Sequence, residues 1–168
     1  MGLVGVRGKV IVDTPLLSPV YGTPCAGYVW VIESGKQDDD GDWTWSRESA
    51  QARCNDFRLQ DATGEIRVIA EGIDLFGKKT PDDHELISSG RRQGEILLSQ
   101  DLDVMLIGDA CTRDGKTVIA QGKQPNAVFG LAETKEVENR RVLAPLWRAG
   151  GFYAVAVGLI GVGIMAMT

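Results

Sequence analysis

Apolar and polar side chains alternate along the first part of the chain. Between residues 3 and 12, valines face one side of an extended segment while Arg7 and Lys9 face the other. This period of two residues predicts a half-buried β-strand. The run from Cys25 to Glu33 is rich in aromatic and β-branched side chains, which predicts a second, well-packed strand. A polar run follows it and predicts the tip of a long hairpin, with the returning strand at residues 43–48.

The pattern in the middle of the chain predicts a tight β-hairpin. Two short runs, Phe57 to Gln60 and Glu65 to Val68, flank the sequence Asp-Ala-Thr-Gly. Asp61 can accept backbone N–H groups in an Asx-type turn, and Gly64 can adopt a positive φ angle. Further strands are predicted at residues 94–99, 103–111 and 116–121.

The period changes after Pro125. The run from Ala132 to Arg148 is rich in helix formers and places Glu136 four residues before Arg140, where the two charges can pair. This pattern predicts a helix, kinked at Pro145, that leads into the apolar end of the sequence.

The last stretch, Gly150 to Thr168, contains no charged side chain. A helix of this length reaches roughly 28 Å, close to the hydrocarbon thickness of a bilayer. A buried core helix is the alternative, but such helices usually keep a polar stripe, so we predict a membrane anchor. Ala154, Gly158 and Gly161 fall on one small-residue face of that helix, which predicts self-association through the anchor into a homo-oligomer.

These patterns together predict a mainly β fold with a single domain. We expect a β-rich, barrel-like or sandwich-like domain over residues 1–131, a short juxtamembrane helix over 132–148, and a C-terminal transmembrane helix over 149–168. A chain of 168 residues has room for one hydrophobic core of ordinary size.

Composition removes several classes of function. The net charge is −5 and the sequence pI is near 4.9, so the domain should repel phosphate backbones, and we expect no nucleic-acid partner. The three cysteines, Cys25, Cys54 and Cys111, are too widely spaced to predict a disulfide framework or a zinc site.

No motif in the sequence predicts catalysis, a cofactor or a metal site. Residues 72–79 have the spacing of a phosphate-binding loop, but Lys79 stands where the magnesium-binding hydroxyl belongs and no helix follows. Asp38, Asp40 and Asp42 resemble the start of a calcium loop that lacks its glutamate, so we expect a solvated turn. The only histidine, His84, is predicted to be a surface residue. Any acid-base chemistry would have to use scattered carboxylates.

Four separated segments resemble the GIDE domain family, also called BAM for "beside a membrane", whose members include a mitochondrial ubiquitin ligase. The segments are residues 18–34, 57–72 and 91–110 and the apolar segment that begins at Trp147. The residues that match the family pattern are Pro24, Cys25, Tyr28, Phe57, Asp61, Gly64, Arg91, Arg92, Glu95 and Gly108.

The resemblance implies a β-rich domain that lies against a bilayer. In the ligase the domain sits between two membrane helices and precedes a RING domain that performs ubiquitin transfer. This sequence has no RING cysteine and histidine array, so ligase activity does not carry over, and its first residues do not form a membrane helix. Arg140, Arg141 and Arg148 before the predicted anchor favour a cytoplasmic domain, whereas the family places the domain on the opposite side.

Arg91, Arg92 and Glu95 are the candidate binding residues. The basic pair can meet lipid phosphates or the carboxylates of a protein partner, and a solvated strand end is the alternative. We therefore predict a membrane-anchored, non-catalytic domain that binds a protein partner or the lipid surface. The alternative function is a substrate-docking or accessory component related to ubiquitin ligases, working with a separate RING-type partner.

Overall fold

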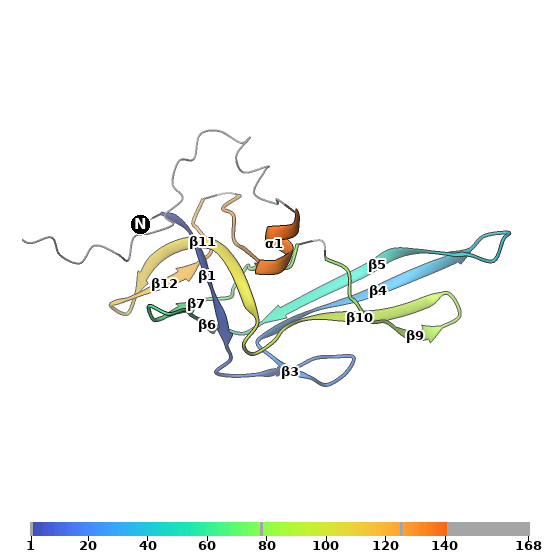
Figure 1. The fold of residues 1–168 in the computed structure, drawn as a ribbon, viewed down its shortest axis with the longest axis horizontal. Coiled ribbons are helices and arrows are strands. Elements are labelled where there is room, and N and C mark those ends of the chain that lie inside the picture. The colour runs from blue at the N-terminus through green and yellow to red at the C-terminus, as the bar shows by residue number, and fades with distance from the viewer. Residues whose placement is uncertain (1, 78, 125, 141–168) are drawn as a thin grey trace, which may run out of the picture.

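The computed structural model describes residues 2–77, 79–124 and 126–140. In this part of the chain β-strands predominate and one short helix follows them (Figure 1). The elements are β1 (Leu3–Ile11), β2 (Leu16–Leu17), β3 (Pro24–Cys25), β4 (Gly27–Gln37), β5 (Trp43–Cys54), β6 (Phe57–Gln60), β7 (Glu65–Val68), β8 (Asp74–Leu75), β9 (Glu85–Ser88), β10 (Arg91–Leu98), β11 (Asp103–Arg113), β12 (Lys116–Ala120), β13 (Gly130–Glu133) and α1 (Thr134–Arg140).

Five strands close into a barrel. Their order is β1-β6-β7-β12-β11, and β11 pairs back with β1, so that Val6 lies opposite Leu106. Neighbouring strands are antiparallel except β7 and β12, which run parallel with Val68 opposite Ile119. This order, with one parallel pair, is the topology of the five-stranded Greek-key barrel called the OB-fold. Closure gives every barrel strand a neighbour on both sides.

The hydrophobic core fills the barrel. Apolar side chains alternate along the barrel strands, and the inward-facing set includes Val10, Leu59, Val68, Leu106 and Ile119, each at most 2% exposed. Burying one such side chain contributes about 1.5–3 kcal/mol to folding. The alternation seen in the sequence is therefore the signal that builds the barrel wall.

A second sheet projects from the barrel, and we call it the arm. It has four strands in the order β5-β4-β10-β9, and it is built from two insertions between barrel strands. Val29 and Val31 of β4 and Ile96 and Leu98 of β10 join the barrel core at the base of the arm. The remainder of the arm extends away from the barrel to a free end, as Figure 1 shows.

The predicted tight hairpin is confirmed as β6 and β7. Asp61 Oδ1 accepts the backbone N–H groups of Thr63 and Gly64 at 2.7 and 3.1 Å, and Gly64 has a φ of 151°. The hydrogen bonds from Thr63 lower the pKa of the Asp61 carboxyl, because they stabilise the ionised form. This turn therefore depends on local chemistry that is visible in the sequence.

The predicted helix at residues 132–148 begins later than expected. Residues Gly130–Glu133 form β13, which pairs with β11 and places Leu131 opposite Leu106, and α1 starts at Thr134. Leu131 is 4% exposed, so strand pairing and burial outweigh the helix propensity of the surrounding residues. Helix α1 is described as far as Arg140, and the rest of the predicted helix lies outside the described residues.

The predicted fold class needs a correction. The β-rich domain is confirmed as a barrel with an arm, but the expected C-terminal transmembrane helix is not part of the described structure. Among residues 2–77, 79–124 and 126–140, no helix has the length and apolar character to cross a bilayer. Helix α1, seven residues long, spans only about 10 Å and carries several charged side chains. Residues 149–168, with Ala154, Gly158 and Gly161, lie outside the described residues.

Candidate functional site

A buried ion pair links the two central strands of the arm. Arg92 Nε lies 2.7 Å from Glu33 Oε2, and the Glu33 side chain is only 6% exposed. The guanidinium carbon of Arg92 lies 4.2 Å from the centre of the Trp45 ring, in a cation–π arrangement. The buried side chain of Glu33 therefore has a cationic partner inside the sheet, as buried acidic groups generally require.

His84 completes this cluster, contrary to the predicted surface position. Its side chain is 17% exposed, and Nε2 lies 3.1 Å from Glu33 Oε2. Nε2 is buried, and its geometry relative to Glu33 Oε2 does not meet the criteria for a hydrogen bond, although the two atoms are close. The sequence prediction was wrong because the segment before β9 folds over Gly94 of β10, where a Cβ atom would lie 2.6 Å from the Asp83 carbonyl oxygen.

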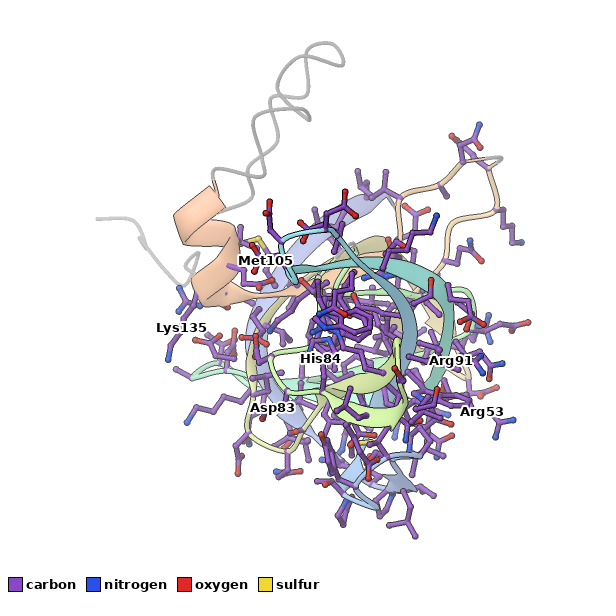
Figure 2. All side chains as sticks on the ribbon, turned by 90° about the vertical axis from the view of Figure 1, so that its right-hand side faces the viewer. Arg53, Asp83, His84, Arg91, Met105 and Lys135 are labelled. Atoms are coloured by element: carbon purple, nitrogen blue, oxygen red, sulfur yellow. The ribbon has the colours of Figure 1, made fainter. Side chains whose placement is uncertain are left out.

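The three predicted site residues share β10 but point in different directions. Successive side chains on a strand alternate between faces, so Arg91 and Glu95 lie on one face and Arg92 on the other. Arg91 donates to both carboxylate oxygens of Glu48, at 3.0 and 2.7 Å. Figure 2, viewed from the free end of the arm, shows Arg91 to one side of the molecule's axis and His84 nearer the centre.

Glu95 holds the loop between β2 and β3 against the arm. Its two carboxylate oxygens accept from Ser18 Oγ at 2.6 Å and from the Val20 backbone N–H at 2.9 Å. Ser18 Oγ in turn accepts the N–H of Thr23 at 2.9 Å. Glu95 thus organises a loop, and all three predicted residues have partners within the chain.

Two tryptophans form a flat aromatic surface near the free end of the arm. The Trp43 and Trp45 rings stack with centroids 5.4 Å apart and an interplanar angle of 21°. Both rings lie across Gly35, where a Cβ would come within 2.8 Å of Trp43 and 3.0 Å of Trp45. Glycine is required there because any larger side chain would lift the rings from the sheet. Trp43 remains 42% exposed despite this packing.

Strand β9 carries the most exposed apolar side chains of the arm. All four of its residues are exposed, with Leu86 at 72% and Ile87 at 46%. In the described part of the chain β9 pairs on one side only, with β10. The pairing is irregular, because Arg92 lies opposite Leu86 and Arg91 opposite Ser88, so Ile87 forms a bulge. We refer to Trp43, Leu86 and Ile87 as the arm-end surface.

Acidic residues precede both parts of the arm-end surface in the sequence. The turn between β4 and β5 contains Asp38, Asp39, Asp40 and Asp42, which we call the acidic loop, and Asp82 and Asp83 precede β9. Asp38 Oδ1 accepts the backbone N–H groups of Asp40 and Asp42 at 3.1 and 2.8 Å, which makes this a turn as predicted. In the described residues no group of three or more His, Cys, Asp or Glu side chains is placed to hold a metal ion.

Lys79, from the loop that resembles a phosphate-binding motif, serves a structural role. Its Nζ lies 2.6 Å from Glu133 Oε1 and 3.7 Å from Glu136 Oε1. Burial works to lower the Lys79 pKa, but these carboxylates outweigh it and raise the pKa above its ordinary value. The lysine therefore fixes the loop to β13 and α1.

Two of the three cysteines are poor nucleophiles. Burial raises the pKa of the Cys54 thiol to about 12, with further contributions from Cys25 and Asp56. Burial also raises the pKa of Cys25, which is completely buried. Both thiols therefore stay protonated at neutral pH.

Comparison with known proteins adds no assignment. No protein-family model, no curated protein and no solved structure matches the chain.

Sequence reasoning missed the arm-end surface. Leu86 and Ile87 form a short apolar pair in a polar stretch, a pattern equally typical of a buried turn or an edge strand. Their significance depends on the position of β9 at the edge of the arm, which local sequence does not encode.

Proposed function

We propose that this chain is a non-catalytic domain that binds a protein partner through the free end of its arm. The observation that carries the proposal is the exposure of Leu86 and Ile87 on the edge strand β9. The exposed ring of Trp43, on β5, reaches Gly90 in the turn between β9 and β10, where a Cβ would lie 3.4 Å from the ring. Exposed aliphatic and aromatic side chains that cluster on a rigid element are typical of protein interfaces.

The arm suits recognition because it is rigid and projects from the barrel. The buried pair of Arg92 and Glu33 ties β10 to β4, and the exposed pair of Arg91 and Glu48 ties β10 to β5. A surface that is already organised loses little conformational entropy when a partner binds. The barrel then acts as the scaffold that carries the binding surface, since the same fold can carry many different functional sites.

A protein partner fits the arm-end surface better than a lipid surface does. The acidic loop ends next to Trp43, and Asp82 and Asp83 precede the strand that carries Leu86 and Ile87, so each exposed apolar part has negative charge near it in the sequence. Anionic lipid headgroups carry the same sign and would be repelled. The resemblance to domains that lie beside a membrane is compatible with this arrangement if the arm points away from the bilayer.

Site-specific photo-crosslinking tests the proposal. A photo-reactive amino acid placed at Leu86 in the full chain, in cells that express it, should give a discrete protein adduct. The control position is Thr117, an exposed residue of β12. Strand β12 belongs to the barrel and lies far from the arm in Figure 1. Adducts of equal yield at both positions, or adducts at Leu86 to lipid alone, would overturn the proposal.

A further inference from the structure

Resting on the proposed function, we infer that the partner contributes an extended segment of alternating basic and apolar residues, which adds to β9 as a fifth strand of the arm. A strand that is paired on one side presents a row of N–H and C=O groups on the other. An incoming strand satisfies these groups, and its side chains determine which sequence is accepted. The free side of β9 in the described chain provides this template.

The apolar part of the recognised sequence follows from the register of the arm. Leu86 lies opposite Arg92, so its side chain is on the inner face, the face that carries Glu33 and Trp45. An incoming strand places every second side chain beside Leu86 on that face. Because Leu86 is 72% exposed, an apolar neighbour there would remove apolar area from water on both chains.

The basic part follows from the local charge. The two arginines nearest to β9 are already paired, Arg91 with Glu48 and Arg92 with Glu33. Asp82 and Asp83, which precede the strand, and Glu85 within it therefore leave an excess of negative charge at the free edge. Lysine or arginine side chains on the incoming strand complement this charge and accelerate association.

The same charges argue against a second copy of this chain as the occupant. Strand β9, Glu85–Ser88, contains no lysine or arginine, so a second β9 strand would bring no basic side chain to the acidic free edge. It would also bring a second set of the acidic residues Asp82, Asp83 and Glu85. The occupant is therefore a different, positively charged segment.

Three synthetic heptapeptides distinguish binding that depends on charge alone from binding that also requires strand addition. The first alternates lysine with valine, the second alternates glutamate with valine, and the third alternates lysine with glycine. The third keeps the charge of the first but lacks residues that favour a strand. Binding of each labelled peptide to the full chain is measured by fluorescence anisotropy at about 0.15 M ionic strength.

The lysine–valine peptide should bind at least about tenfold more tightly than either of the others. Hydrogen exchange of the β9 amides that face the free edge should slow in its presence. Leu86→Lys and Ile87→Lys should each weaken its binding by about tenfold or more, since each adds a repelling charge and removes apolar contact. The matched control is Gln51→Lys, an exposed substitution on β5 at the opposite edge of the arm, which should leave binding unchanged.

Equal binding of both lysine peptides, or loss of binding in the Gln51→Lys variant, would show attraction by charge alone and overturn strand addition. Binding of the full chain to anionic vesicles that is lost in the Leu86→Lys variant would make the arm-end surface a lipid site instead. If the photo-crosslink at Leu86 persists while the peptides show no such preference, strand addition fails and the protein-binding function stands. If both measurements fail, both proposals fall.

Discussion

Arg92 and Glu33 form a salt bridge inside the arm, with Nε 2.7 Å from Oε2. The carboxylate is almost completely buried, while the guanidinium is one-quarter exposed and packs on Trp45. Removing one partner of such a pair leaves an uncompensated buried charge, which costs more than the pair contributes. The pair therefore helps to hold β4 and β10 together near the free end of the arm, beyond the residues that join the barrel core.

We expect Arg92→Met to lower the free energy of unfolding by about 3 kcal/mol. This value is at the low end of the range for breaking a buried ion pair, because Arg92 is partly exposed. The neighbouring Arg91→Met is the matched control, because Arg91 and Glu48 are both more than 40% exposed. It should cost less than about 1 kcal/mol. Urea unfolding of the two variants measures the difference, and equal losses would contradict a special role for the buried pair.

Gly94 should resist substitution because the chain before β9 passes directly over it. A Cβ at this position would lie 2.6 Å from the Asp83 carbonyl oxygen and 2.7 Å from Pro81 Cβ. We expect Gly94→Ala to destabilise the protein by about 1–3 kcal/mol, since backbone must move to make room. Gly5→Ala in β1 is the control, because a Cβ there meets nothing within 4 Å. Thermal unfolding of both variants checks the prediction, which fails if the two melt alike.

Asp103 should contribute to loss of stability in acid. A hydrogen bond from Arg7 lowers the pKa of this carboxyl below its ordinary value of 3.8, with a second one from Thr134. Because the folded pKa is the lower one, ionised Asp103 stabilises the fold above about pH 4, and this contribution is lost as the pH falls through the folded pKa. The variant Asp103→Asn should therefore lose less stability than the natural sequence between neutral and acidic pH.

Urea unfolding at a series of pH values measures how steeply the free energy of unfolding changes with pH in both proteins. Ser46→Ala serves as a control, because it replaces an exposed group that does not titrate. Its stability should follow the pH dependence of the natural sequence. A slope for Asp103→Asn that equals the natural one would show that the pairing with Arg7 does not contribute.

The cysteines should differ in their reaction with iodoacetamide. With a pKa of about 12, the Cys54 thiol is ionised in on the order of one molecule in ten thousand at pH 8. Cys25 is completely buried, whereas Cys111 is partly exposed on β11. Mass spectrometry of the folded protein should therefore find Cys111 modified first, and all three modified in urea. Modification of folded Cys54 at the rate of Cys111 would contradict the burial that raises its pKa.

The sequence by itself determined the elements whose signals are local. The period-two alternation predicted β1 and the strands of the core, and Asp61 with Gly64 predicted the hairpin of β6 and β7. Side-chain alternation and turn chemistry act within a few residues, so they can be recognised without knowledge of the fold. The β-rich character of the domain follows from the same signals.

Only the tertiary structure decided how these elements pair. Ala132 and Glu133 were predicted to begin a helix, but they end β13, because Leu131 is buried beside Leu106. Closure of the barrel, the arm built from two separate insertions, and the edge position of Leu86 and Ile87 all depend on contacts between distant segments. His84 reaches Glu33 for the same reason, across about fifty residues of chain. Long-range pairing is a property of the whole chain. It places Leu86 and Ile87 on an exposed edge strand, which their local sequence does not predict.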